Sequence, residues 1–318
     1  MPVLLADIGG THIRFALRGA EGPQNIKKYR LDNFPDLKAA VQHYMTEEAM
    51  PPLSSMAIAG TSWLENGKIR YRRDRTKAPL DIDPEGLASH LGLQDLSFLN
   101  DLEAACYGLS CLAPGQTEIL RQGEGSPPNR DLCLLSVGTG AGHSFYLNDT
   151  QTVRKSFGGF VPLNVQTDDQ RQVRDYILKT HPQDRDLAME DVVSARGLRW
   201  IYEAFSGLSV AGLEDAAFSL LLQKPNEAAR QSVRVFCEFL GLHAQILLGV
   251  SFVYGGLYLT GGVIDNLMAH DLFNRGAFED FLIADTVMVV KKTQASVPVF
   301  YCLEQNMPLV GLNRFSQA

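Results

Sequence analysis

The N-terminal residues combine a short apolar run, a glycine turn and a second, alternating run. Residues 3–6 are apolar, the run stops at Asp7, and Gly9-Gly10-Thr11 then provides the flexible residues of a tight turn. Apolar side chains recur at every second position from 13 to 17, a period that is typical of a strand and not of a helix. We therefore expect two strands joined by the glycine turn, as a hairpin.

The same order of strand, glycine turn and strand returns later in the chain. The apolar run 132–137 leads into the glycine-rich residues 138–142, and the alternating residues 143–147 follow. Neither turn feeds a helix, which separates both from the P-loop and the Rossmann fingerprint. A third glycine pair, Gly261-Gly262, also follows an apolar run but precedes a segment that is typical of a helix start. The repetition predicts two halves with a related local plan.

The segments between the glycine turns show helical periodicity. Apolar residues recur at helical spacing in the segments 168–180, 189–205 and 226–250, and we expect each to be a helix. Residues 96–99 are typical of a strand, and residues 102–112 of the helix after it. Strands that alternate with helices in both halves predict an α/β fold, and a ligand held by two such halves would lie in the cleft that joins them.

Composition and charge restrict the class of protein. The chain has 318 residues, about twice a usual domain, and hydrophobic residues make up 45%, enough for a large core. The net charge of -7 provides no overall basic field for a nucleic acid. The N-terminus lacks the features of a signal peptide, and no segment approaches the ~20 apolar residues of a membrane span. We expect a cytoplasmic protein without a nucleic-acid or membrane partner.

The five cysteines favour a reducing compartment. They are odd in number, widely scattered and without CxxC spacing, which argues against a disulfide framework or a zinc site. We expect small buried thiols at Cys106, Cys111, Cys133, Cys237 and Cys302.

Glycine turns at strand ends are suited to binding phosphate. Glycine lets backbone N–H groups approach a ligand closely, because no Cβ is in the way. Thr11 and Thr139 add a hydroxyl to each turn, so two turns that face one cleft would hold a nucleotide triphosphate from both sides. Asp7 would meet the accompanying Mg²⁺ directly or through water. The alternative is that each turn only closes a hairpin.

Phosphoryl transfer also requires a group that removes the proton of the acceptor, usually a carboxylate. Our candidate is Asp101, because it lies at the carboxyl end of a predicted strand, where ligands bind in α/β folds. The alternative is that Asp101 or Asn100 only caps the following helix, which would stabilise it by about 1 kcal/mol.

Five segments, in their order and at their intervals, together resemble the bacterial glucokinase family over nearly the whole chain. They are LLADIGGTHIRFAL, SFLNDLEAACYGL, LLSVGTGAGHSFY, EDVVSARGLRWIYEA and LYLTGGVIDNL. The resemblance implies the actin-like ATPase and sugar kinase fold, in which two α/β domains with related, ribonuclease H-like cores close on ATP and a hexose. It implies a small domain of residues 1–110 and 304–318 and a large domain of residues 111–303. Members of this family are often homodimers.

The resemblance also assigns roles to individual residues. Those implied to bind ATP, with Asp7 near Mg²⁺, are Asp7, Gly9, Gly10, Thr11, Gly138, Thr139, Gly140, Gly261 and Gly262. Asp101 matches the base that takes the proton of the sugar hydroxyl, and Asn100 and Glu190 match residues that bind the sugar. Without the family, Glu190 is more typical of a solvated residue in the first turn of a helix.

The sequence departs from the family in the sugar-binding element. The family's Glu-Gly-Gly-His corresponds to Phe157-Gly158-Gly159-Phe160, so the substrate-binding glycines remain while both polar side chains are replaced by phenylalanine. Two lost hydrogen bonds of about 1 to 3 kcal/mol each are enough to change the substrate. The phenylalanines would stack on the apolar face of a different sugar, or another polar group compensates for the loss.

A basic segment stands where the family has a Thr-Asn element with a downstream Trp. It contains Arg70, Arg72, Arg73, Arg75 and Lys77. It is either a solvated loop or a contact for an anionic group on a modified or phosphorylated substrate.

Two hypotheses of function remain. The first is an ATP- and Mg²⁺-dependent sugar kinase of glucokinase type with Asp101 as base, for which glucose, giving glucose 6-phosphate, is the family default. The second is a catalytically altered relative that acts on a different sugar or serves as a ligand-binding or regulatory protein. The retained Asp101 favours the first, and the lost Glu and His favour the second. The related repressor and open-reading-frame kinases usually carry a cysteine-rich zinc element, which this chain lacks.

Overall fold

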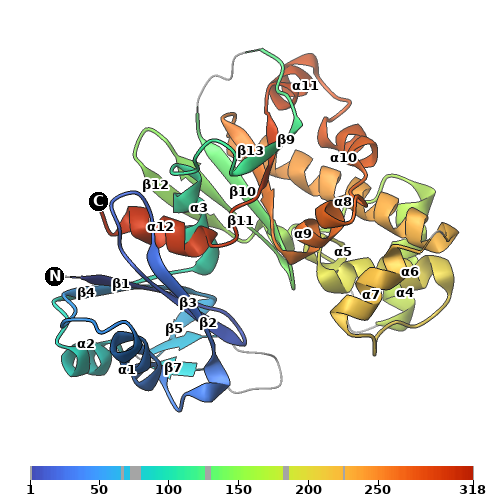
Figure 1. Ribbon diagram of the computed structural model, residues 1–318. Helices are drawn as coiled ribbons and strands as arrows, with labels where there is room; N and C mark the ends of the chain where they lie inside the picture. The colour runs from blue at the N-terminus through green and yellow to red at the C-terminus, as the bar shows by residue number, and fades with distance from the viewer. Residues whose placement is uncertain are drawn as a thin grey trace. The chain divides into compact units, whose positions relative to one another are not determined.

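The computed structural model of the chain divides into two compact units. Unit 1 comprises Met1–Pro114 and Glu304–Ala318, and unit 2 comprises Gly115–Leu303. The structure describes residues 2–65, 68–71, 80–125, 130–181, 186–224 and 226–317. Each unit combines helices with a mixed sheet and has its own hydrophobic core, which confirms the predicted α/β class (Figure 1).

Unit 1 is built on a five-stranded sheet in the order β3-β2-β1-β4-β8. Its strands are β1 (Val3–Ile8), β2 (His12–Leu17), β3 (Gln24–Arg30), β4 (Ser55–Gly60) and β8 (Asp95–Leu99). β1 and β2 pair antiparallel across the first glycine turn, which confirms the predicted hairpin, whereas β4 and β8 run parallel to β1. A smaller sheet contains β5 (Ser62–Glu65), β6 (Lys68–Tyr71) and β7 (Leu80–Ile82).

Side chains along a strand point alternately to the two faces of the sheet, and in unit 1 both faces of the main sheet are apolar. One face packs under α1 (Leu37–Glu47) and α2 (Pro84–Leu91), and the other under α3 (Asp101–Leu109) and α12 (Met307–Phe315). Figure 1 shows the two pairs of helices on opposite faces. α3 and α12 approach closely because a glycine lies at their crossing: a Cβ on Gly311 would overlap the carbonyl oxygen of Ala104. A 3₁₀ helix, η1 (Leu31–Asn33), follows β3.

Unit 2 repeats this plan in a six-stranded sheet with the order β12-β11-β10-β13-β14-β9. Its strands are β9 (Thr117–Arg121), β10 (Leu132–Val137), β11 (Ala141–Leu147), β12 (Thr152–Ser156), β13 (Gly256–Thr260) and β14 (Val299–Cys302). β10 and β11 pair antiparallel across the second glycine turn, and β13 and β14 continue the sheet in parallel. The five strands from β12 to β14 match β3 to β8 of unit 1 in order and direction, which confirms the predicted repetition.

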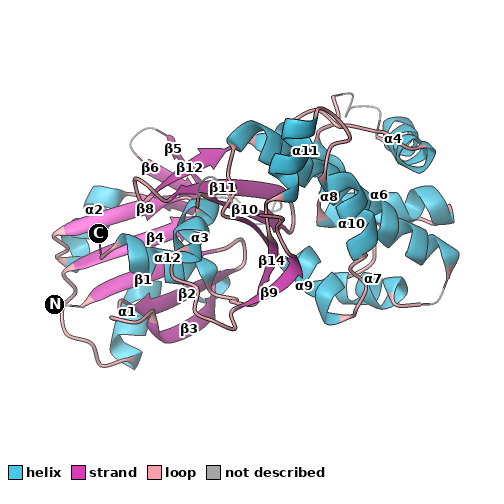
Figure 2. Cartoon of the chain, turned by 90° about the horizontal axis from the view of Figure 1, so that it is seen from above, coloured by secondary structure: helices cyan, strands magenta, loops and turns pink. Residues whose placement is uncertain are grey.

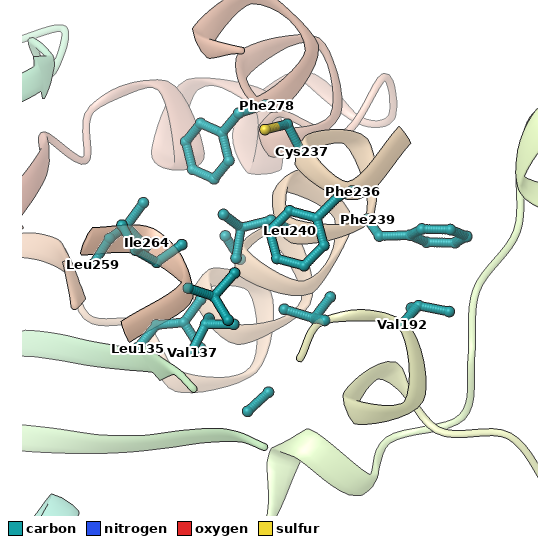
Figure 3. Packing of buried hydrophobic residues seen from close by; sticks show 14 of the residues in the cluster. Leu135, Val137, Val192, Phe236, Cys237, Phe239, Leu240, Leu259, Ile264 and Phe278 are labelled. Carbon is teal, nitrogen blue, oxygen red and sulfur yellow. The ribbon is translucent and has the colours of Figure 1, made fainter. Parts of the chain in front are cut away.

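A long helix forms the centre of the unit 2 core. Figure 3 shows Phe236 and Leu240 of α8 (Glu227–Ser251) packed beside Leu135 of β10 and Ile264 of α9 (Gly262–Ala269). α8 begins where expected, because the Asn226 side chain accepts a hydrogen bond from the backbone N–H of Ala229. The other helices of unit 2 are η2 (Gly158–Phe160), α4 (Asp168–Thr180), α5 (Met189–Val192), α6 (Ala195–Ser206), α7 (Asp215–Leu222), α10 (Arg275–Leu282) and α11 (Met288–Ala295). Figure 2 shows α4, α6, α7, α10 and α11 from above.

Two expected helices differ from the structure. Residues 189–205 form two helices and not one, because Ser194 has an extended backbone and its hydroxyl caps Gly197, so that α6 starts anew. The helix expected at 102–112 begins at Asp101 and ends at Leu109. The C-cap is Ser110, and the structure gives no further reason for this end.

α8 is long and apolar enough to cross a membrane, yet 72% of its apolar window is buried inside the structure, as in a core helix. All five cysteines belong to the described residues and are free thiols. Four are buried, as predicted, whereas Cys111 is exposed.

Candidate functional site

Three parallel strands of unit 1 end at one edge of its sheet. The register pairs Ile8 with Gly60 and Ala59 with Leu99, so the residues that follow β1, β4 and β8 are neighbours. These residues are the first glycine turn, Thr61 and the pair Asn100-Asp101. The structure therefore brings together, within unit 1, the residues that the sequence assigned to phosphate binding and to proton removal.

Asp101 is bound by a residue from outside its own helix. The hydroxyl of Thr61 donates a hydrogen bond of 2.8 Å to Oδ2 of Asp101, while Oδ1 accepts one of 3.0 Å from the N–H of Leu102. Sequence reasoning missed Thr61. The signal for it was the apolar run of β4, which ends in Gly60 at the same edge of the sheet.

Asn100 caps α3, as the alternative interpretation of the sequence held. Its Oδ1 accepts a hydrogen bond of 3.0 Å from the N–H of Leu102, and Glu103 accepts one of 3.3 Å from the N–H of Asn100. This reciprocal arrangement is a capping box, which fixes the start of the helix directly beside Asp101.

Asp7 is a buried carboxylate next to the first turn. Its Oδ2 lies 2.8 Å from Nη1 of Arg14, which is its partner across the β1–β2 hairpin. Burial raises the pKa of Asp7 to about 6; the Arg14 guanidinium opposes this rise, and the negative charge of Asp101 adds to it. Because the charge of Asp101 raises the pKa of Asp7, the two carboxyl groups interact electrostatically.

The first glycine turn is exposed and is closed by a backbone hydrogen bond. The N–H of Gly9 donates to the carbonyl of His12 at 2.9 Å, and Gly9, Gly10 and Thr11 are all exposed. The hydroxyl of Thr11 lies 2.9 Å from Nδ1 of His12. This geometry leaves the turn accessible to an anion but contains no ligand-specific feature.

The second turn and the third glycine pair lie together in unit 2. The N–H of Gly138 donates to the carbonyl of Gly140 at 2.9 Å, which closes the turn between β10 and β11. Gly261 has a φ of 102°, and a Cβ there would lie 2.5 Å from the carbonyl oxygen of Val137. Only glycine combines this conformation with so close an approach, so the start of α9 is held against the second turn.

A cavity of about 380 Å³ adjoins these glycines. Its lining includes Gly138, Thr139 and Gly262, all predicted, and also residues that sequence reasoning missed, from α6, α7 and α9. Among the missed residues, Arg199 places its guanidinium 4.5 Å from the ring centre of Phe218 and pairs with Asp215 at 2.8 Å. Ser219 donates a hydrogen bond of 2.9 Å to Asn266. The cavity thus has an aromatic ring, a paired guanidinium group and an amide beside a glycine turn.

Glu190 lies in the first turn of α5, as the alternative interpretation held, but it is fixed against the second turn and is only partly solvated. Its Oε2 accepts a hydrogen bond of 3.1 Å from the N–H of Ala141, and the residue is half-buried. A Cβ on Gly140 would lie 2.6 Å from that oxygen, and one on Gly159 would lie 3.5 Å from it. Unit 2 therefore brings Glu190 together with Gly140 and with the Gly158-Gly159 pair.

The Gly158-Gly159 pair leaves no room for a side chain. A Cβ on Gly158 would overlap the imidazole of His143, and one on Gly159 would overlap the carbonyl oxygen of Ala141. The backbone is held by Ser156, whose Oγ accepts a hydrogen bond of 3.2 Å from the N–H of Gly158 and lies 2.8 Å from Nε2 of His143. The flanking rings point outward: Phe157 is 87% exposed and Phe160 is 65% exposed.

Two buried histidines lie behind this element. The rings of His143 and His243 are 5.9 Å apart. Within the described residues, Nδ1 of His143 and both ring nitrogens of His243 have no hydrogen-bond partner. Burial lowers the pKa of His143 to about 4 and that of His243 to about 3, so both are neutral at physiological pH.

Most of the basic segment lies outside the described residues. Residues 72–79, which include Arg72, Arg73, Arg75 and Lys77, are not described. Arg70 is described, and its Nε lies 3.2 Å from a carboxylate oxygen of Asp81.

Comparisons with known proteins find the same family over nearly the whole chain. The sequence model of the family described as Glucokinase matches residues 4–318. The chain is 27% identical to a glucokinase of Sinorhizobium fredii, over 100% of this chain and 92% of that protein.

Solved structures show the same fold. A glucokinase from an Antarctic psychrotroph has a TM-score of 0.81 at 25% identity, covering 99% of this chain and 98% of that one. A glucokinase from Balamuthia mandrillaris, in complex with glucose, has a TM-score of 0.77 at 21% identity, covering 100% and 94%. The fold implied by the resemblance is confirmed.

Proposed function

This chain belongs to the glucokinase family of sugar kinases, and we propose that it transfers the γ-phosphate of ATP to a hydroxyl of a hexose with Asp101 as general base. The observation that carries the proposal is the hydrogen bond from Thr61 to Asp101. A carboxylate that served only as a helix cap would need no partner on another strand. This partner orients the carboxylate at the edge where the parallel strands end.

In the proposed step the hydroxyl oxygen of the sugar forms a bond to the γ-phosphorus, and its proton passes to the carboxylate of Asp101. The bond between the γ-phosphorus and the bridging oxygen breaks, and ADP leaves with the electron pair. Because Thr61 and Leu102 each donate a hydrogen bond to Asp101, its carboxylate keeps one orientation before the proton arrives.

The residues present fit a nucleotide. A Cβ on Gly138 or Gly262 would meet no heavy atom within 4 Å, so open space lies beside the backbone at both positions, while the N–H of Gly138 itself is used to close the turn. We propose that Gly138, Thr139 and Gly140 bind phosphate oxygens and that the adjoining cavity, which Gly262 lines, receives the adenosine, with Gly261 next to it in the chain. In unit 1, we propose that the first turn, with Gly9, Gly10 and Thr11, also binds phosphate.

The residues also fit Mg²⁺ held mainly by phosphate oxygens and water. The described residues contain no group of three or more His, Cys, Asp or Glu side chains that would hold a metal ion. Asp7 is the carboxylate next to the first turn, and Arg14 occupies its Oδ2, so we propose a contact through water. When bound, Mg²⁺ neutralises charge on the phosphate oxygens.

For the sugar we propose contacts from Asn100, Glu190 and the Gly158-Gly159 pair. The Oδ1 of Asn100 is engaged in the helix cap, so its contribution would be a hydrogen bond from Nδ2. Glu190 uses one carboxylate oxygen to hold Ala141, and its other oxygen can accept from a sugar hydroxyl. Glucose is the acceptor that the curated relatives' name suggests.

A coupled assay of ADP release on a panel of hexoses tests this proposal. Turnover that depends on ATP, Mg²⁺ and a sugar is expected, and Asp101→Ala should lose turnover by about 10² to 10⁴-fold while ATP binding persists. Asp95→Ala, at the opposite end of β8, is the matched control and should keep turnover. Unchanged turnover in Asp101→Ala would remove this residue from the mechanism.

The second candidate is a ligand-binding or regulatory relative without turnover. It is favoured by one observation, the exposed Phe157 and Phe160 in place of two polar residues. Tight binding of ATP without ADP release on any acceptor would support it over the kinase.

A further inference from the structure

A second hollow of unit 2 shares a residue with the sugar-binding element. It has a volume of about 460 Å³, within the range of about 300 to 1,000 Å³ of small-molecule pockets. Its apolar lining consists of Phe160, Pro162, Leu163, Leu178 and Leu187, with Arg174 and Asp186 as the charged residues. Phe160 is also the last residue of η2, which contains Gly158 and Gly159, the two glycines proposed to contact the sugar. Phe160 therefore connects the hollow to the proposed sugar contact along the chain.

The wall of this hollow and Glu190 belong to one backbone ladder. The N–H of Leu163 donates to the carbonyl of Leu187 at 2.8 Å, and the N–H of Met189 donates to the carbonyl of Val161 at 2.9 Å. These bonds flank the bridge between Pro162 and Ala188. Since Glu190 follows Met189 directly, the position of the hollow relative to Glu190 is fixed by paired backbone and not by a free loop.

Five of the seven lining residues are apolar, and one of the two charged ones is already paired. The guanidinium of Arg174 is engaged with the carboxylate of Asp175 at 2.7 Å. The ring of Phe160 remains 65% exposed, and Leu178 on α4 is 36% exposed. An apolar group placed between them would remove these surfaces from water, which is favourable in proportion to the apolar area covered.

We propose that the acceptor is a hexose that carries a substituent with an aromatic ring, and that this ring occupies the hollow beside Phe160. The inference rests on the proposed function, because it takes the sugar ring to lie at Glu190 and the Gly158-Gly159 pair. In this proposal, the phenylalanines that replace the family's Glu and His remove a polar contact to the sugar and provide an apolar contact to its substituent. Phe160 and Leu178 become residues that determine specificity.

Matched pairs of acceptors test this inference. One pair is methyl and phenyl β-glucoside, and the other is N-acetyl and N-phenylacetyl glucosamine, so the substituent is placed on two different carbons of the ring. We expect the phenyl member of at least one pair to exceed its partner by about tenfold or more, both in kcat/KM and in the association constant from calorimetry. Equal values within both pairs would overturn the inference.

The binding measurement separates this inference from the proposed function. Tighter binding of a phenyl compound without any ADP release would leave the hollow as a binding site and reject the kinase. Turnover of glucose with no advantage for either phenyl compound would keep the kinase and reject the hollow.

Two neighbouring residues of α4 provide matched variants. Leu178 lines the hollow, whereas Lys179 is exposed and does not. Leu178→Glu places a charge in the hollow and should bring the ratio of phenyl to methyl compound close to one, while Lys179→Glu should leave the ratio as in the wild type. Thermal unfolding of both variants checks that they fold. A ratio that Leu178→Glu does not change would contradict the assignment of the hollow.

A double variant tests the other side of the same inference. Phe157→Glu combined with Phe160→His restores the family's pair of polar residues. It should lower KM for unsubstituted glucose and remove the preference for the phenyl compound, because Phe160 no longer flanks the hollow. A preference that survives this change would show that Phe160 is not its source.

Discussion

The hydroxyl of Thr61 donates a hydrogen bond to the carboxylate of Asp101 across two neighbouring parallel strands. Thr61 follows β4 and Asp101 begins α3 after β8, so the contact exists only because the two strands end in register. It leaves Asp101 with two donors, one for each carboxylate oxygen. A base held in this way has its orientation fixed before substrate arrives.

Thr61→Val should therefore lower kcat by about 10 to 100-fold, the effect of losing a hydrogen bond to a charged group. The KM for ATP should stay as in the wild type, because the nucleotide is assigned to other residues. Steady-state kinetics with ATP and hexose varied in turn measure both constants. Thr61→Ser keeps the hydroxyl and is the matched control; if it lost as much activity as Thr61→Val, the hydrogen bond would not be the cause.

Gly138→Ala should weaken ATP binding without harming the fold. The added methyl group meets no heavy atom within 4 Å, so no strain is expected in the folded chain. It would enter the space assigned to phosphate and should raise the Kd for ATP by about tenfold or more. Gly212→Ala is the control, because its Cβ also projects into open space but lies outside the turn. Calorimetric titration with ATP compares the two, and equal affinity in both variants would reject the second turn as a phosphate site.

Filling the adjoining cavity should affect the nucleotide and not the sugar. Ser219 lines the cavity, whereas its neighbour Leu220 is 62% exposed and does not. Ser219→Phe should raise KM for ATP by about tenfold or more, since the new ring takes the volume assigned to adenosine. Leu220→Phe should leave KM unchanged. Thermal unfolding monitors the fold of both variants, and a loss confined to the KM for sugar would contradict the assignment.

Local pattern was sufficient to predict the hairpins and most helices. The alternation from 13 to 17 and the glycines at 9 and 10 act within a few residues, so β1, β2 and the turn between them follow from the sequence alone. The long apolar periodicity and the cap at Asn226 predicted α8 in the same way. The break at Ser194 was missed because helical spacing continues through it, although a serine is a common start signal for a helix.

Contacts in the candidate site that depend on strand register were not predicted. Thr61 and Asp101 are 40 positions apart and meet only through the pairing of β4 with β8. Arg14 was treated as one polar position of an alternating strand, whereas the register places it opposite Asp7. Asn100 illustrates a different limit: a residue that precedes a helix can be predicted as a cap or as a ligand contact, and the sequence does not separate the two.

Acid should destabilise this protein through its two buried histidines. Both have a pKa below the ordinary value of 6.5, about 4 for His143 and about 3 for His243, because burial disfavours the charged ring. The unfolded chain therefore binds protons below pH 6.5 that the native chain does not, so the stability that is present above pH 6.5 falls as pH decreases toward 4. Each histidine should reduce the free energy of unfolding by about 2 kcal/mol between pH 7 and pH 5.

His243→Leu isolates one of the two contributions. Both nitrogens of His243 lack partners within the described residues, so its replacement removes a desolvated polar ring without breaking a hydrogen bond found there. Between pH 7 and pH 5, the free energy of unfolding of the variant should fall by about 2 kcal/mol less than that of the wild type, as measured by urea unfolding at both pH values. Leu242→Met, a buried neighbour on α8 without a titratable group, should show the pH dependence of the wild type. If the free energy of unfolding fell equally with pH in His243→Leu and in Leu242→Met, the acid sensitivity would arise from groups other than His243.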